Sequence, residues 1–81
     1  SSTTANIVLP EKNRSYFGII SEDAEDATKI AYVNISLGGT ITITNVGTSQ
    51  LSATYDKTTQ TISVSGLGTE KFLHYMFSHS Y

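Results

Sequence analysis

The sequence predicts an all-β fold, a small antiparallel β-sandwich of immunoglobulin-like or jelly-roll-like character with about six to seven short strands. Three observations support this fold class. Apolar and polar residues alternate along much of the chain, as they do in strands that bury one face. Turn-forming residues recur at intervals of about 8–12 residues, which is typical of sandwiches and barrels. Any long segment that could form a helix can also be interpreted as a strand.

Residues 30–45 show the alternation most clearly, with a Gly38-Gly39 pair between two alternating runs. A two-residue turn at the glycines would place apolar residues opposite polar ones, whereas a three-residue loop at 38–40 pairs Leu37 with Ile41. We therefore predict a hairpin with an odd-length loop and a glycine at positive φ, or else no direct pairing of the two runs. The predicted core face consists of Ala31, Val33, Ile35, Leu37, Ile41 and Ile43. The predicted surface face consists of Tyr32, Asn34, Thr42 and Thr44.

A second hairpin is predicted from the alternating runs at 51–55 and 61–65. The apolar residues of the two runs come opposite each other, on one face of the hairpin, only when the loop has an even number of residues. Residues 56–59 are therefore expected to form a four-residue loop that pairs Ala53 with Ile62. An aspartate in the first position of this loop suits a type I turn.

The N-terminal part of the chain begins with small polar residues, SSTTA. We expect residues 1–5 to be a flexible terminal segment and residues 6–81 to form a single β domain. Residues 6–9 are predicted to form a short strand that ends at Pro10, because proline lacks the amide that a strand ladder needs.

Residues 15–20 are predicted to form the next strand. Gly18 within this run indicates either a β-bulge or the close approach of another backbone. Alternation assigns the large side chains to two faces, with Phe17 and Ile19 on one and Tyr16 and Ile20 on the other.

Residues 21–28 interrupt the alternation and contain four carboxylates within five residues. Ser21 could cap a short helical turn here, with Lys29 at its C-terminal end. A calcium loop is the alternative, but the spacing lacks the central glycine and distant glutamate of the EF-hand pattern. We therefore predict a short helical turn or solvated loop and no metal site.

Residues 69–81 (TEKFLHYMFSHSY) fit two structures. As a helix, the segment has an apolar stripe at helical spacing; as a strand, it has apolar residues on both faces. The all-β context favours the strand, with the helix as the alternative. An apolar strand of this kind is expected to contact another copy of the chain. The predicted contact residues are Phe72, Tyr75, Met76 and Phe77.

Length and composition exclude several function classes. A chain of 81 residues without cysteine has a small core and no disulfide to compensate, so burial against another copy or a neighbouring domain is expected. The net charge is −2 and the five basic residues are scattered, which argues against nucleic-acid binding. No apolar run is long enough to insert across a membrane, and the chain is expected to be a processed form or a fragment.

The sequence contains no recognisable catalytic motif. The two histidines, His74 and His79, are five residues apart and point in different directions on either a strand or a helix. The glycine string at 66–68 lacks the lysine of a phosphate-binding loop. We therefore predict that the chain is not an enzyme, that it has no catalytic or metal-binding residue, and that it needs no cofactor.

Five tyrosines on a background rich in serine and threonine resemble a recognition surface. The alternative, which the sequence favours for each tyrosine taken singly, is that tyrosine simply suits half-buried strands. In composition the chain resembles small β domains of phage fibres, capsid decorations and bacterial surface adhesins. The resemblance implies a structural or attachment module of a virion or cell-surface assembly that acts outside the cell through protein–protein contacts. The alternative is a monomeric module that binds a carbohydrate, such as a receptor glycan, or a protein. For this role the candidate residues are Tyr32, Asn34, Thr42 and Thr44.

Overall fold

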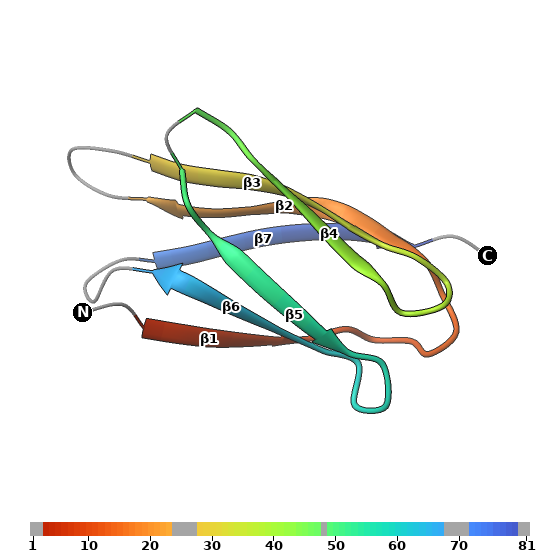
Figure 1. Ribbon diagram of the computed structural model, residues 1–81. Coiled ribbons are helices and arrows are strands. Elements are labelled where there is room, and N and C mark those ends of the chain that lie inside the picture. Colours follow the sequence, from red (N-terminus) through yellow and green to blue (C-terminus); the bar gives the residue numbers. More distant parts are fainter. Residues whose placement is uncertain (1–2, 24–27, 48, 68–71, 80–81) are drawn as a thin grey trace.

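The computed structural model describes residues 3–23, 28–47, 49–67 and 72–79, which form seven β-strands and no helix (Figure 1). The all-β prediction is therefore confirmed. The strands are β1 (Thr3–Val8), β2 (Tyr16–Asp23), β3 (Thr28–Ile35), β4 (Ile41–Asn45), β5 (Ser52–Asp56), β6 (Thr61–Leu67) and β7 (Phe72–His79). Within these residues there is no helix of the length and apolarity that crossing a bilayer requires.

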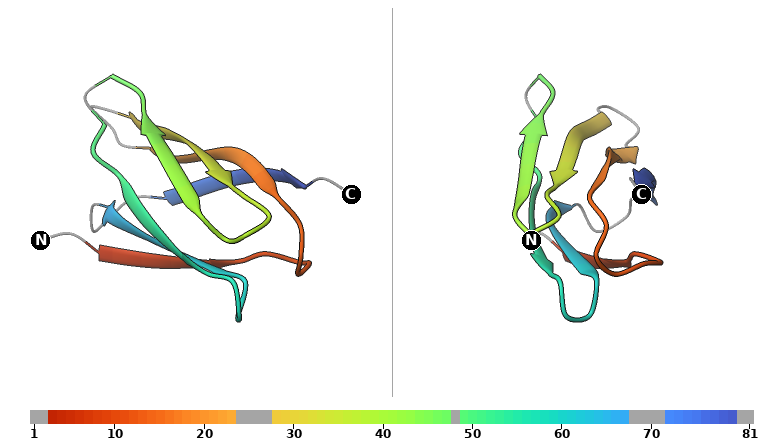
Figure 2. Two further views of the ribbon diagram at one scale, coloured as in Figure 1. Left: turned by 45° about the vertical axis from the view of Figure 1, so that its right-hand side comes forward. Right: turned by 90° about the vertical axis from the view of Figure 1, so that its right-hand side faces the viewer.

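The strands form two antiparallel sheets, consistent with a small sandwich (Figure 2). One sheet has the order β1-β6-β5, and the other has the order β4-β3-β2-β7. In the second sheet, β7 follows a strand of the first sheet and lies beside β2. The order β7-β2-β3-β4 resembles the spatial order of a Greek key, except that the chain passes through β5 and β6 of the other sheet before it reaches β7.

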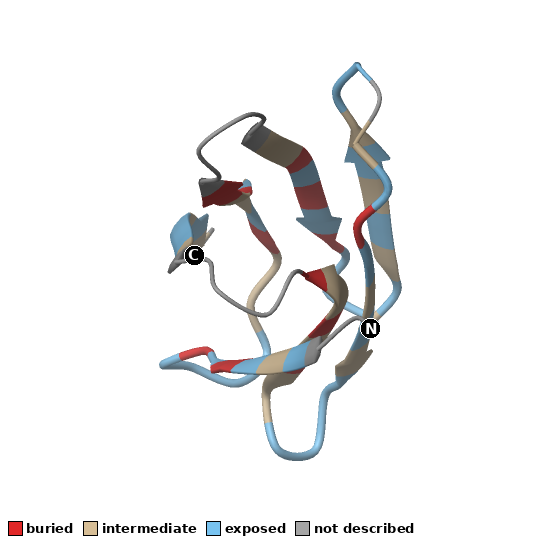
Figure 3. Ribbon diagram, turned by 90° about the vertical axis from the view of Figure 1, so that its left-hand side faces the viewer, coloured by how far each residue is buried: buried red, intermediate tan, exposed pale blue. Residues whose placement is uncertain are grey.

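The core lies between the sheets and consists of the inward residues of both (Figure 3). On β3 the buried residues alternate with exposed ones, as the period of a pleated strand requires. Ile41 and Ile43 of β4 pack against this core while remaining partly exposed. The buried apolar residues are Ile7, Leu9, Tyr16, Ile20, Ala31, Val33, Ile35, Leu51, Ile62, Val64 and Leu67.

The hairpin of β3 and β4 has the predicted three-residue loop, but the loop begins one residue earlier. The Ser36 amide donates to the Thr40 carbonyl at 2.8 Å, so the loop spans 37–39 and Ile35 pairs with Ile41. Gly39 has the predicted positive φ, at 95°. The assignment of Leu37 to the core was wrong, because this residue lies in the loop and is exposed.

The β5–β6 hairpin also has the predicted loop length with a shifted position. Asp56 pairs with Thr61, so the four-residue loop spans 57–60. Tyr55 therefore faces Ile62, where Ala53 had been expected. The Asp56 carboxylate accepts a hydrogen bond from the Thr58 amide at 2.9 Å, a contact typical of an aspartate that begins a turn.

The short helical turn predicted at 21–28 is wrong for the described residues. Residues 21–23 end β2 and residue 28 begins β3, while residues 24–27 lie outside the described part. Glu22 is buried rather than solvated, and its carboxylate lies 3.6 Å from the Lys29 ammonium on the paired strand. Lys29 also donates to the Gly66 carbonyl at 2.8 Å, which links the two sheets.

Several strand boundaries differ from expectation, most of all in β1 and β2, and one alternative is resolved. β1 begins at Thr3, so part of the polar N-terminal segment pairs with β6. β2 extends to Asp23 and pairs with β7 along its whole length without a bulge. The C-terminal segment is a strand at residues 72–79, as predicted, and the helical alternative is wrong there.

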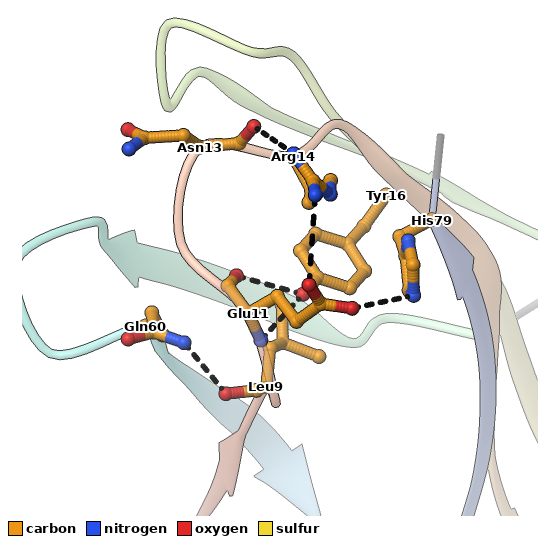
Figure 4. Close-up of polar contacts among 7 residues, drawn as sticks. All are labelled: Leu9, Glu11, Asn13, Arg14, Tyr16, Gln60 and His79. Carbon is orange, nitrogen blue, oxygen red and sulfur yellow. Dashed lines mark hydrogen bonds and ion pairs between the residues drawn. The ribbon is translucent and has the colours of Figure 1, made fainter. Parts of the chain in front are cut away.

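Tyr16 fixes the connection between β1 and β2, where the chain passes from one sheet to the other (Figure 4). Its hydroxyl donates to the Glu11 carbonyl at 2.8 Å and accepts from the Glu11 amide at 3.0 Å. This arrangement is a tyrosine corner, in which the hydroxyl binds the backbone a few residues upstream.

The same end of the sandwich is tied to β7 through a polar cluster (Figure 4). The Glu11 carboxylate lies 3.0 Å from His79 Nε2, a charged pair when the imidazole is protonated, and 3.6 Å from Arg14. The His79 ring also meets the Tyr16 ring edge-on, with centroids 5.7 Å apart. The C-terminal end of β7 is therefore held against the rest of the fold.

Candidate functional site

The four-stranded sheet carries a continuous apolar cluster on its outer face. Because Tyr16 and Ile20 point into the core, their neighbours Phe17 and Ile19 point outward. Strand pairing places Ile19 between Tyr32 of β3 and Met76 of β7. The four outward side chains are 61 % (Phe17), 41 % (Ile19), 53 % (Tyr32) and 75 % (Met76) exposed. We refer to these four residues as the apolar outer face.

Polar side chains border this cluster. Phe17 pairs with Asn34 on one side and with Ser78 on the other. On the edge strand β4, Thr42 pairs with Asn34 and Thr44 pairs with Tyr32. Interfaces often combine an apolar centre with a polar rim in this way.

A shallow hollow of about 390 Å³ lies where the apolar cluster meets this polar border. The residues that line it are Phe17, Gly18, Tyr32, Val33, Asn34, Thr42 and Thr44. A second depression of about 280 Å³ continues across β2 to Met76. The face thus offers aromatic surface, an amide and two hydroxyls within one patch.

The structure brings together all four residues that the sequence selected as a binding surface. Tyr32, Asn34, Thr42 and Thr44 are exposed on neighbouring strands and line the larger hollow. These residues lie on one face because the loop has an odd number of residues. The loop length is odd in both the predicted and the observed register. Their role in binding remains a prediction.

The residues predicted to contact another copy do not share one surface. Met76 points outward and joins the apolar outer face. Phe77 points the other way and packs partly against the core, while Tyr75 on the same side as Phe77 is 57 % exposed. The rings of Tyr75 and Phe77 lie 6.1 Å apart. The side chain of Phe72 lies outside the described part of the structure.

Phe17 and Ile19 belong to this surface but were not selected from the sequence. The available signal was the run YFGII, in which both faces of one strand are apolar. Only one of those faces can point into a two-layer core. The tyrosine corner determines the choice, because it directs Tyr16 inward and thus Phe17 outward.

The outer face of the three-stranded sheet differs in character. Its side chains are small and polar, and several bond one another: the Ser52 and Ser65 hydroxyls lie 2.7 Å apart, and Ser63 donates to Asn6 at 3.0 Å. Val8, 70 % exposed, is the one large apolar side chain exposed among the described residues of β1, β5 and β6. The apolar cluster is therefore specific to one side of the sandwich.

The apolar outer face and its polar border offer two kinds of contact to a partner. The apolar and aromatic groups of the face provide dispersion and burial, and the amide and hydroxyl groups of its polar border provide hydrogen bonds. Across the described ranges, no group of three or more His, Asp or Glu side chains is placed to hold a metal ion.

Comparisons of the chain with protein-family models, with curated protein sequences and with solved structures found no significant match. The surface described above therefore provides the basis for inferring a function.

Proposed function

We propose that this chain is a non-enzymatic structural or attachment module that acts through protein–protein contacts made by the apolar outer face. The observation that carries the proposal is the contiguous exposure of Phe17, Ile19, Tyr32 and Met76 across three paired strands. Contiguous exposed apolar patches with polar borders mark interaction sites, whereas single exposed apolar residues are ordinary. The outer face of the opposite sheet is polar, so the apolar cluster distinguishes one side of the sandwich from the other.

The composition of the cluster matches that of interface centres. Aromatic residues and methionine are enriched there, and Phe17 and Tyr32 would be the principal anchors. β2 and β3 pair along all eight of their residues, so the side chains are presented from a rigid platform. A preorganised surface loses less conformational entropy on binding than a mobile loop.

We further propose that the assembly is a virion or a cell surface, on the basis of the Ser/Thr-rich composition and its resemblance to attachment domains. The partners would be a neighbouring protein of the assembly or a surface receptor.

A second candidate function is carbohydrate binding in the hollow beside Tyr32. The observation that favours it is the combination of two aromatic rings with one amide and two hydroxyls around about 390 Å³. An aromatic ring can stack on the apolar face of a sugar ring while polar groups bind its hydroxyls.

The test measures binding by Phe17→Ser and Tyr32→Ser variants. Proteins of the native source are captured on the immobilised chain and identified, and their affinities for each variant are measured. We expect at least a tenfold loss of affinity, corresponding to about 1.4 kcal/mol or more. Val8→Ser is the matched control, since it removes an apolar side chain that is even more exposed, from the other sheet. Circular dichroism confirms that each variant is folded.

Two outcomes would contradict the proposal: affinity that survives both substitutions, or an equal loss in the Val8→Ser control. A panel of soluble glycans is tested in parallel. Glycan binding that is lost in Tyr32→Ser, without any captured protein, would favour the carbohydrate function instead.

A further inference from the structure

β7 is the outermost strand of the four-stranded sheet, and one of its edges is not paired with any strand that the structure describes. An open edge presents a row of backbone amide and carbonyl groups that can pair with another chain. Proteins usually protect such edges with charges, prolines, bulges or short strands. The four edges of this sandwich differ in how far they are protected.

Three edges carry a protective feature. The pairing of β1 with β6 shifts register between Thr3 and Ala5, as at a bulge. β4 and β5 have only five residues each and lie in contact at one side of the sandwich. There the Asn45 side chain joins their connection, donating to the Leu51 carbonyl at 2.9 Å and accepting from the Leu51 amide at 2.8 Å.

The free edge of β7 lacks these features. Its eight residues, FLHYMFSH, include no proline and no aspartate, glutamate, lysine or arginine. Its register with β2 is unbroken over all eight residues, so no bulge bends the edge away. A long, regular edge strand without acidic residues, lysine or arginine is a ready template for another strand.

We infer that a second copy of the chain pairs antiparallel with this edge, with the two-fold axis at Tyr75. This register places Leu73 opposite Phe77 of the second copy and Tyr75 opposite its own counterpart. Leu73 and Phe77 lie on the inner face and are partly buried in the single chain. On the outer face, His74 lies opposite Met76 of the second copy. The contact is isologous, as the two-fold symmetry of a dimer requires.

The sequence of β7 itself favours a second copy as the occupant. Apolar residues meet apolar residues on the inner face when the strand is paired with itself, and no like charges oppose each other. An axis at Met76 would instead place Leu73 opposite His79, whose imidazole already contacts Glu11 and Tyr16. The axis at Tyr75 leaves that cluster intact.

Pairing in this register would join two four-stranded sheets into one continuous sheet. A two-fold axis between antiparallel strands is perpendicular to the sheet, so both apolar outer faces would lie on the same side. The inference rests on the edge of β7 and does not require the proposed function of that face.

The experiment places charges on the two-fold axis. Tyr75→Lys and Tyr75→Glu each put like charges opposite each other, so each variant alone should be monomeric. An equimolar mixture of the two should regain the dimer, because opposite charges then meet at the axis. Sedimentation velocity over a micromolar concentration series measures the mass. The unmodified chain should approach twice its mass of 8.8 kDa.

The Tyr32→Lys variant is the control for the outer face: it should remain dimeric while losing any partner of that face. A monomeric unmodified chain at the highest concentration, a dimeric single variant, or a mixture that stays monomeric would each overturn the inference. Amide hydrogen exchange of the unmodified chain tests the same point without substitution. Protection of β7 amides should rise with protein concentration, and protection independent of concentration would contradict the dimer.

Discussion

Gly18 determines how closely β7 can approach β2. It lies in the middle of the four-stranded sheet, between Val33 on β3 and Phe77 on β7 in the strand register. A β-carbon at this position would overlap the Met76 carbonyl and lie 2.6 Å from a ring carbon of Phe77. The close approach expected from a glycine inside a strand is therefore confirmed, while the alternative, a bulge, is wrong.

We predict that Gly18→Ala destabilises the fold by about 1–3 kcal/mol, the usual cost of overpacking a close contact. The β7 backbone would have to move away from β2, since a carbonyl oxygen cannot rotate aside. Urea denaturation measures the change in unfolding free energy. Gly38→Ala is the control, because its β-carbon would meet nothing closer than 3.9 Å. An equal effect in both variants would show that the packing at Gly18 is unimportant.

At the scale of elements, both hairpins show which part of a strand register can be derived from the sequence. Face parity required an odd first loop and an even second loop, and the loops have three and four residues. The starting position of each loop was wrong by one residue. Parity cannot detect that error, because moving a loop by one residue shifts the pairing by two and leaves every side chain on its face.

Backbone conformation would have resolved the first loop. Three-residue hairpin loops place their third residue at positive φ, which glycine adopts without strain. The observed loop, 37–39, has Gly39 in that position with φ at 95°. The predicted loop, 38–40, would have placed Thr40 there, and a β-branched residue is strained in that region.

We predict that Gly39→Ala destabilises the hairpin by about 1–2 kcal/mol, the cost of an L-residue in a left-handed conformation. Gly39→Asn should lose less, because asparagine tolerates this region. Thermal unfolding followed by circular dichroism measures both variants, with Gly38→Ala as the neighbouring control. If asparagine proved as destabilising as alanine, the loss would come from the side chain meeting Lys57, whose Cδ lies 3.0 Å from the added carbon.

The incorrect helical turn shows where local reasoning failed. The charge order of residues 21–29 suits a helix, with acidic residues first and a lysine last. The same order also suits a hairpin, in which Glu22 pairs with Lys29 across the strands. Tertiary burial favours the second arrangement, since Glu22 is 2 % exposed and faces the lysine.

At the scale of the whole molecule, the fold class and most of the core followed from alternation alone. Strand order did not, because β7 lies beside β2 only after the chain has passed through the other sheet. For the same reason the sequence indicated two separate surfaces, one around Tyr32 and one around Met76. Ile19 lies between them in the folded sheet and makes them one surface.

Packing of the two sheets also affects the ionisation of Tyr55. Tyr55 belongs to β5 and packs against the core from the three-stranded sheet. Burial raises the pKa of Tyr55 above its ordinary value, and the nearby Tyr16 of the other sheet and Asp56 raise that pKa further. The folded state therefore binds the phenolic proton more tightly than the unfolded state does.

By linkage, the stability associated with the neutral Tyr55 is fully present below its unfolded pKa of about 10 and is lost as pH rises through the higher folded pKa. We predict that the unfolding free energy of the unmodified chain falls over this alkaline window more steeply than that of Tyr55→Phe, which has no proton to lose. Urea denaturation at a series of alkaline pH values compares the two slopes. All other side chains are the same in the two proteins, so the difference between the slopes reports on the Tyr55 hydroxyl. Parallel slopes would show that ionised Tyr55 is accommodated without disturbing the contact between the sheets.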